Sequence, residues 1–245
     1  MRSMRQLLLL SSSREGQSGY LETAQLQIKA FLKECDFSSN DEILFIPFAG
    51  VSIDYDQYHD MVQQALQASD IKVTALHHSE DPATAIKKAK AIMVGGGNTF
   101  HLLHQLYQFE LLGLIRDAVI AGVPYIGWSA GSNIAAPNIK TTNDMPIVQP
   151  PSFHALHLVP FQINPHYIDQ HPPGFNGETR EQRINEFLLV NPDSKVVGLP
   201  EGSALKIFDN RVELLGNHQA FIFADGKKDA LDVSQLEKML TESLD

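Results

Sequence analysis

Cysteine is almost missing from this 245-residue sequence, in which Cys35 is the only one. A single cysteine excludes an internal disulfide framework and a cysteine-rich zinc site, and it fits a reducing compartment. Basic clusters are also missing, because none is longer than Lys87-Lys88, and 29 acidic residues against 19 basic ones leave a formal net charge of -10. We therefore expect no nucleic-acid partner.

Long apolar runs are a further absence. The run from Leu7 to Leu10 is too short for the apolar core of a secretory signal and ends at Ser11, so it predicts a buried strand. Nothing approaches the roughly 20 apolar residues of a membrane span. We expect a soluble, cytoplasmic protein without a membrane partner.

Short apolar runs alternate with longer segments of helical period, and this pattern predicts an α/β fold with a mostly parallel sheet and helices on both faces. The predicted strands are 7–10, 42–46, 72–76, 91–94, 124–126 and 195–199. The predicted amphipathic helices include 21–32, 58–66 and 100–107. With 43% apolar residues, the chain has enough core for one catalytic domain over 1–245.

The pattern changes after Gly202. Residues 204–208 and 211–215 predict a hairpin, and 221–223 a further strand, so antiparallel strands are added near the C-terminus. The core is expected over about 7–223, followed by a helix at about 232–244. The proline-bearing interval 137–178 predicts a long loop region rather than a second domain.

A Gly-x-Ser-x-Gly pentapeptide follows the strand at 124–126. It places Ser129 at its apex, between Gly127 and Gly131. A serine on a tight turn from strand to helix stands clear of the sheet, which suits a nucleophile that attacks an acyl carbon. Glycine and serine also cluster in ordinary turns, so the pattern needs partners elsewhere.

A glycine run, Gly95-Gly96-Gly97, follows the strand at 91–94. It fails the dinucleotide pattern, because Phe100 holds the last glycine position. The N-H groups of Gly97 and Ala130 are instead predicted to form an oxyanion hole. The same run is a tight turn in which we expect Thr99 to cap the next helix.

A serine nucleophile needs a base to accept its proton. His166, in the loop region after the elbow, is one candidate. An alternative set of Ser129, Asp193 and His218 has the residue order of the α/β-hydrolases, and both stay open at this point.

Other histidines recur at three-residue spacing without matching a zinc signature: His101 and His104, and His154 and His157. We expect neither a metal nor a cofactor.

Two acids are candidates for orienting the base. Glu201 ends a predicted strand and is thus rigidly held, whereas Asp144 lies in the loop region, where an Asn-Asp pair typically forms a turn. Glu201 is preferred, and Asp144 remains an alternative.

Arg180 is predicted in the first turn of a helix that begins with a capping box of Thr179 and Gln182. A cation there opposes the helix dipole, so a compensating anion is expected. The anion is either Glu178 or Glu181, or else a substrate carboxylate that Arg180 and the helix end receive together.

With these residues in view, the sequence resembles the peptidase E family of serine exopeptidases, the α-aspartyl dipeptidases. The resemblance spans roughly residues 7–223 and rests on seven segments in family order: Ile46-Pro-Phe-Ala-Gly50, Val94-Gly-Gly-Gly-Asn-Thr-Phe100, Tyr125-Ile-Gly-Trp-Ser-Ala-Gly131, Thr141-Thr-Asn-Asp-Met-Pro-Ile-Val148, Gln162-Ile-Asn-Pro-His166, Gly177-Glu-Thr-Arg-Glu-Gln-Arg183 and Gly198-Leu-Pro-Glu-Gly202.

The resemblance implies a flavodoxin-like fold related to class I glutamine amidotransferases, with Ser129 where those enzymes carry a cysteine. It implies His166 as the general base. Asp144 matches an aspartate to which the family assigns the orienting role, with Glu201 as the structurally placed alternative. Arg180 matches the arginine credited with selecting an N-terminal aspartate.

The function implied is hydrolysis of dipeptides, or short peptides, with N-terminal aspartate through an acyl-enzyme on Ser129. Asn98 and loop carbonyls are candidate acceptors for the substrate's α-amino group, and a homodimer is compatible with this class. Two alternatives remain: a cyanophycinase-like serine peptidase on the same fold, and a non-catalytic anion-binding module.

Overall fold

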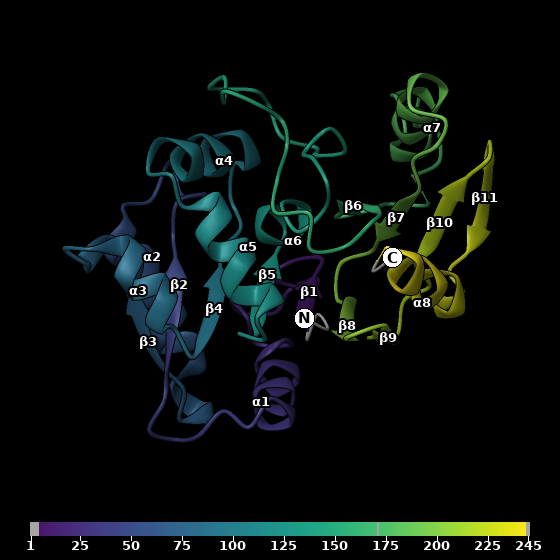
Figure 1. Ribbon diagram of the computed structural model, residues 1–245. Coiled ribbons are helices and arrows are strands. Elements are labelled where there is room, and N and C mark those ends of the chain that lie inside the picture. Colours follow the sequence, from purple (N-terminus) through teal and green to yellow (C-terminus); the bar gives the residue numbers. More distant parts are fainter. Residues whose placement is uncertain (1–4, 171, 244–245) are drawn as a thin grey trace.

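The computed structural model describes residues 5–170 and 172–243 (Figure 1). Within these residues the larger of two sheets has seven strands in the order β3-β2-β4-β5-β1-β8-β9. They are β1 (Gln6–Leu10), β2 (Glu42–Ile46), β3 (Lys72–Ala75), β4 (Ala91–Val94), β5 (Tyr125–Trp128), β8 (Ala204–Phe208) and β9 (Arg211–Leu215). The first five pair in parallel, whereas β8 and β9 are antiparallel. The predicted parallel sheet with an antiparallel C-terminal hairpin is confirmed.

Side chains of β1 alternate between two apolar clusters, one on each face of the sheet. Leu7 and Leu9 belong to one cluster, and Leu8 and Leu10 to the other. The first cluster is covered by α3 (Pro82–Lys88), α4 (Thr99–Gln108) and α5 (Leu112–Ile120), and the second by α1 (Gln25–Glu34) and α2 (Tyr55–Leu66). Two 3-10 turns, η1 (Gln67–Ser69) and η2 (Leu76–His78), flank β3. Helices therefore lie on both faces, as predicted.

A smaller sheet lies beside the hairpin, on the right of Figure 1. In the described part of the chain it has four strands in the order β11-β10-β7-β6. They are β6 (Gln162–Pro165), β7 (Val196–Leu199), β10 (Phe221–Ala224) and β11 (Lys227–Ala230). Helix α7 (Arg180–Val190) buries Ile184 and Leu188 in a cluster with Val196 and Phe223.

The smaller sheet departs from the prediction in two respects. β6 forms inside the interval 137–178 that we predicted as loop, and β7, predicted among the parallel strands of one sheet, pairs with β6 instead. A four-residue strand containing asparagine and proline has no local pattern that separates it from a loop. Pairing with β7 stabilises it, and pairing is not visible in the sequence.

Helix boundaries differ at the first predicted helix. Leu21 is buried but has a φ of 54° and precedes α1, while Leu26 is 72% exposed. At the C-terminus, α8 (Val233–Glu242) buries Leu236 and Leu240 against the larger core, so the predicted C-terminal helix is confirmed.

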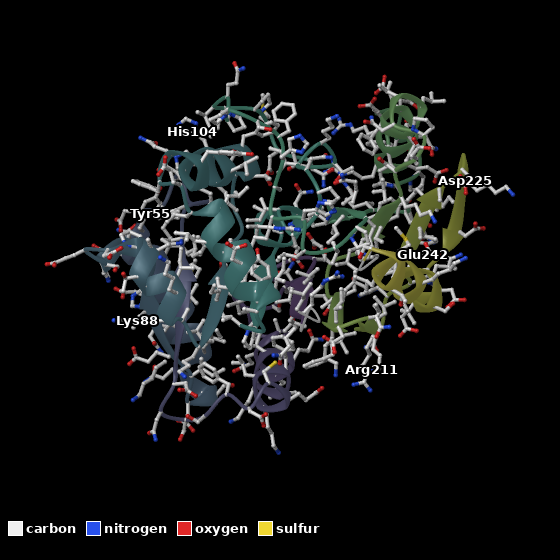
Figure 2. The ribbon with its side chains drawn as sticks, viewed as in Figure 1. Tyr55, Lys88, His104, Arg211, Asp225 and Glu242 are labelled. Atoms are coloured by element: carbon white, nitrogen blue, oxygen red, sulfur yellow. The ribbon has the colours of Figure 1, made fainter. Side chains whose placement is uncertain are left out.

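Charged side chains such as Lys88, Arg211 and Asp225 lie exposed at the edge of the molecule (Figure 2). Across residues 5–170 and 172–243, none of the helices has the length and hydropathy needed to cross a membrane.

Candidate active site

Ser129 lies at the turn between β5 and the short helix α6 (Ala130–Asn133), with a φ of 53° and a ψ of -112°. This backbone conformation is rare for a residue with a side chain, and strain of this kind is concentrated at functional sites. The flanking glycines allow the turn, because a Cβ on Gly127 would collide with the Gly131 carbonyl and a Cβ on Gly131 with the Val94 carbonyl. The side chain of Ser129 therefore stands above the carboxyl edge of the sheet.

His166 follows β6, and Glu201 comes two residues after the end of β7. The two strands are parallel neighbours with Pro165 opposite Leu199, so both side chains emerge at one edge. His166 Nε2 lies 2.9 Å from Ser129 Oγ, and His166 Nδ1 lies 2.7 Å from Glu201 Oε1. Like Ser129, His166 has a positive φ, 54°.

The backbone of His166 is fixed to the main sheet through Ser11, which the sequence analysis did not single out. Ser11 is buried just after β1; its Oγ donates to the Leu199 carbonyl at 2.7 Å and accepts from the His166 N-H at 2.9 Å. One hydroxyl thus joins the end of β1 to the ends of β6 and β7. A serine just after an apolar strand is too common a pattern to predict this bridging contact.

Asp144 contacts the beginning of α4 rather than His166. Its Oδ2 accepts from the Thr99 N-H at 2.7 Å and the Thr99 hydroxyl at 2.6 Å, and it also lies 3.2 Å from Thr142 Oγ1. The structure therefore brings Glu201, and not Asp144, to the imidazole.

The glycine run approaches the elbow from β4. Gly97 has a φ of 139°, and a Cβ there would collide with the Ala49 carbonyl, so glycine is required. Within the described residues, the N-H groups of Gly97 and Ala130 donate no hydrogen bond, which leaves them free for a ligand. The helix cap differs from our expectation: Asn98 is the N-cap of α4, its side chain accepting from the His101 N-H, and Thr99 is the first helical residue.

A pocket of about 480 Å³ opens above Ser129 and His166. Its walls include the loop 49–53, Gly96 and Gly97 of the glycine run, and the side chains of Tyr20, Tyr58 and Trp128. This volume suits a small ligand rather than a folded protein.

Arg180 is the first residue of α7, and the predicted capping box of Thr179 and Gln182 is present. The two acids that could have neutralised Arg180 are paired elsewhere: Glu178 with Arg183 at 2.5 Å and Glu181 with Lys228 at 2.8 Å. Among the described residues, no carboxylate lies within ion-pair distance of Arg180.

The surroundings of Arg180 are mixed in charge. Burial and the neighbouring Arg183 lower the pKa of its guanidinium, while the charge of Asp144 acts in the opposite direction. Asp144 belongs to the loop that also places Ile147 in the pocket wall. Asn98, which lines the pocket, also holds this loop by donating from Nδ2 to the Met145 carbonyl at 2.9 Å.

The competing histidines lie elsewhere. His218 contacts Glu15 at 2.7 Å rather than Ser129, so the set with Asp193 is not assembled. His101 Nδ1 contacts the Phe48 carbonyl at 2.8 Å, and neither predicted histidine pair is part of a potential metal-binding group in the described residues.

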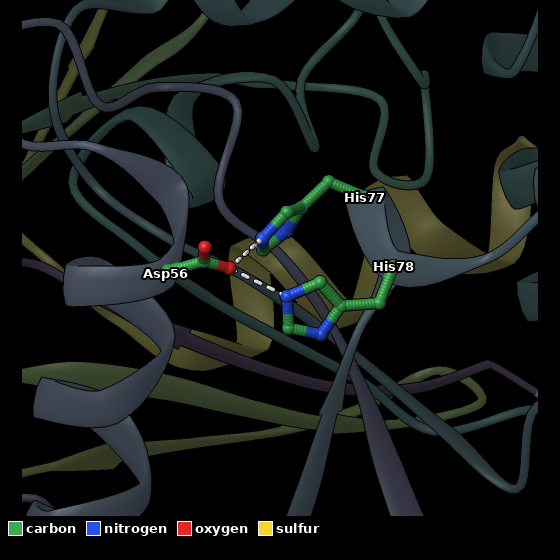
Figure 3. A group of neighbouring side chains, drawn as sticks. All are labelled: Asp56, His77 and His78. Atoms are coloured by element: carbon green, nitrogen blue, oxygen red, sulfur yellow. Dashed lines mark hydrogen bonds and ion pairs between the residues drawn. The ribbon is translucent and has the colours of Figure 1, made fainter.

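One group in the described residues has the side chains to hold a metal ion: Asp56, His77 and His78 (Figure 3). Both Nε2 atoms meet Asp56 Oδ1, at 2.9 Å from His77 and 2.5 Å from His78, and these bonds lower the pKa of the exposed Asp56 carboxyl. The group ties the first turn of α2 to η2 and lies outside the lining of the pocket above Ser129. No local sequence pattern reveals this group, because Asp56 is 21 residues from His77.

Comparisons with known proteins agree on one family. The model of peptidase family S51 matches residues 7–215. Peptidase E of Shewanella denitrificans is 52% identical over 216 residues, covering 88% of this chain and 90% of the relative. Peptidase E of Shewanella baltica strain OS195 is 49% identical over 240 residues, covering 97% and 98%. Peptidase E of Nostoc sp. strain PCC 7120 is 51% identical over 224 residues, covering 91% of each.

Solved structures share the fold. A provisionally named peptidase E protein from Listeria monocytogenes EGD-e superposes with a TM-score of 0.64 at 26% identity, over 88% of this chain and all of that one. A peptidase from an acI-B1 Actinobacterium gives a TM-score of 0.69 over 94% of this chain and 95% of that one. At 18% identity, the second likeness concerns the fold alone.

Proposed function

Because the chain belongs to peptidase family S51, we propose that it is a serine exopeptidase that hydrolyses dipeptides, and short peptides, with an N-terminal aspartate. The observation that carries this proposal is the hydrogen-bonded series from Ser129 through His166 to Glu201 at the pocket. Its high identity to several proteins named peptidase E supports the same substrate class.

The first half of the reaction makes an acyl-enzyme. Ser129 Oγ attacks the peptide carbonyl carbon while His166 Nε2 accepts its proton, and the Glu201 carboxylate stabilises the imidazolium from Nδ1. The Gly97 and Ala130 N-H groups donate to the oxyanion of the tetrahedral intermediate. His166 then protonates the departing amine, and the C-N bond breaks.

The second half releases aspartate. Water replaces the departed amine, gives a proton to His166 Nε2, and attacks the ester carbonyl. The tetrahedral intermediate uses the same two N-H donors. When it collapses, His166 returns the proton to Ser129 Oγ, and the free enzyme is restored.

In this proposal Arg180 receives the aspartyl side chain of the substrate. Two observations support it: Glu178 and Glu181 are paired with other cations, and the charge of Asp144, on the loop beside the pocket, acts on the Arg180 guanidinium. Asn98 Oδ1 already accepts from the His101 N-H and keeps one lone pair, with which it is proposed to accept from the α-amino group.

Hydrolysis of Asp-Leu, Ala-Leu and N-acetyl-Asp-Leu tests the proposal. We expect the wild type to cleave only the first, and Ser129→Ala to cleave none. Turnover of an aspartate-arginine polymer in place of Asp-Leu would favour a cyanophycinase-like enzyme. No turnover at all, with no labelling of Ser129 by a fluorophosphonate, would favour the anion-binding module.

A pair of variants on one helix tests the role of Arg180. Arg180→Met should lower kcat/KM for Asp-Leu. The loss of a desolvated charge pair corresponds to an increase of about 2 to 5 kcal/mol in the activation free energy. Arg183→Met removes the same charge one turn away, from a residue already paired with Glu178, and should change kcat/KM little. Equal losses in the two variants would remove Arg180 from its role.

We further propose that the enzyme acts in the cytoplasm as a homodimer. The free thiol of Cys35 fits the reducing environment of the cytoplasm. On α7, Leu189 and Val190 are 84% and 80% exposed, which supports a partner surface. Sedimentation velocity of the wild type and of Leu189→Lys tests the homodimer, because a dimer that forms through this surface should dissociate in the variant.

A further inference from the structure

Three aromatic side chains in the wall of the pocket form a directed series of hydrogen bonds. Trp128 Nε1 donates to Tyr20 Oη at 3.0 Å, Tyr20 Oη to Tyr58 Oη at 3.0 Å, and Tyr58 Oη to the Gly96 carbonyl at 2.8 Å. The series begins on the residue before Ser129 and ends in the glycine run. We call it the aromatic relay.

The direction of the aromatic relay is forced by its ends. An indole N-H can only donate and a carbonyl oxygen can only accept, so each tyrosine hydroxyl must accept from one side and donate to the other. Trp128 and Tyr58 are 1% and 3% exposed, and burial raises the pKa of Tyr20 to about 12 and that of Tyr58 well above its usual value. Both hydroxyls therefore keep the proton they donate.

The last bond of the relay acts on the peptide unit that carries the Gly97 N-H. The Gly96 carbonyl and the Gly97 N-H belong to one planar group and point in opposite directions, so a bond that holds the oxygen also aims the N-H. Donation to the oxygen also polarises the peptide and strengthens its N-H as a donor. As described above, this N-H has no acceptor within the described residues.

The glycine run is shaped around this contact. A Cβ on Gly95 would collide with the Tyr58 hydroxyl, so glycine is needed there for the hydroxyl to reach the Gly96 carbonyl. A Cβ on Gly96 would press on Ser129 Cβ at 3.0 Å, which shows how closely this peptide approaches the elbow.

We propose that Tyr58, held by Tyr20 and Trp128, is a positioning residue that aims and polarises the Gly97 N-H toward the oxyanion on the acyl group. The inference rests on the proposed function, in which Gly97 supplies an oxyanion donor. It adds a source of oxyanion stabilisation outside the series of Ser129, His166 and Glu201.

The variant Tyr58→Phe isolates this effect. The ring of Tyr58 packs edge-on against Phe45 with centroids 5.1 Å apart, and phenylalanine keeps that contact while losing only the hydroxyl. Tyr107→Phe is the matched control, because Tyr107 also donates to a backbone carbonyl, that of His154 at 2.9 Å, but lies outside the pocket lining.

Removing a whole oxyanion donor lowers kcat roughly 10²- to 10³-fold, and losing only its aim should cost less. We expect Tyr58→Phe to lower kcat for Asp-Leu by about 10- to 100-fold with KM nearly unchanged. The rate of fluorophosphonate labelling of Ser129 should fall in parallel, because phosphonylation also develops an oxyanion. Tyr20→Phe should show a smaller loss, and Tyr107→Phe none.

Unchanged kcat and labelling in a folded Tyr58→Phe would overturn the inference, and a rise in KM alone would mean that the hydroxyl binds substrate instead. Labelling separates this inference from the proposed function, since it needs no aspartate recognition. If the wild type is labelled but fails to cleave Asp-Leu, the proposed substrate is wrong and the labelling rates still judge Tyr58. A wild type that is neither labelled nor active overturns both.

Discussion

Two residues of the site, Ser129 and His166, have positive φ values of 53° and 54°. Such conformations are unfavourable for residues with a Cβ and persist only where the surroundings hold them. At Ser129 the surroundings are the glycines of the elbow, and at His166 they include the bond from its N-H to Ser11 Oγ. Each strained residue thus has a nearby contact that maintains it.

At the residue scale, the choice between Glu201 and Asp144 is testable. Glu201→Gln keeps the shape but removes the charge that stabilises the imidazolium, so kcat for Asp-Leu should fall by roughly 10²-fold or more. Asp144→Asn keeps an acceptor for the Thr99 N-H and should lower kcat by less than about 10-fold. Steady-state kinetics and circular dichroism of both variants check this, and the reverse order of losses would assign the orienting role to Asp144.

At the scale of single elements, α7 is the best example of a helix defined by local chemistry. Thr179 and Gln182 satisfy each other's backbone N-H groups, and Ile184 and Leu188 give the helix a buried stripe. The capping box was recognised in the sequence because its two residues lie within one turn. The pairing of Glu181 with Lys228 instead of Arg180 was not recognised, because these two residues are 47 positions apart in the sequence.

Loss of the cap tests whether the beginning of α7 positions Arg180. Thr179→Ala should cost about 1 kcal/mol of stability and lower Tm by roughly 2 to 4 °C. KM for Asp-Leu should rise as well, because Arg180 is the first residue of this helix.

Asp232→Ala is the control for that experiment. Asp232 caps α8 by accepting from the Ser234 N-H, so the variant should lose a similar Tm without a change in KM. If KM rises in neither variant, the cap of α7 has no part in substrate binding.

At the scale of the whole molecule, the site is built where two sheets meet. The larger sheet supplies Ser129 after β5, and the smaller one supplies His166 and Glu201 after β6 and β7. Ser11 bridges them through the Leu199 carbonyl and the His166 N-H. The alignment of Ser129 with His166 therefore depends on how the sheets are held together.

Ser11→Ala tests this dependence. It leaves the partly buried His166 N-H without its partner and should lower the free energy of unfolding by about 1 to 3 kcal/mol. It should also lower kcat by about 10-fold or more, since a small displacement of a catalytic group is costly.

Ser132→Ala is the comparison for Ser11→Ala. Ser132 is equally buried, and its hydroxyl donates to the Leu10 and Gly127 carbonyls rather than to a group of β6 or β7. Denaturant unfolding and kinetics should show a similar loss of stability but a smaller loss of kcat. A larger loss of kcat in Ser132→Ala would contradict the bridging role of Ser11.

The sequence by itself determined what depends on neighbours along the chain. The alternation of apolar runs predicted the parallel sheet, the Gly-x-Ser-x-Gly spacing placed Ser129 on an elbow, and the capping box marked the beginning of α7. The tertiary structure alone decided which acid meets His166, that β6 is a strand, and that Glu178 and Glu181 pair with other cations than Arg180. The physical reason is that these features depend on contacts across strand pairs and sheets. His166 and Glu201, for example, are 35 positions apart in the sequence, and local propensity carries no information about such pairings.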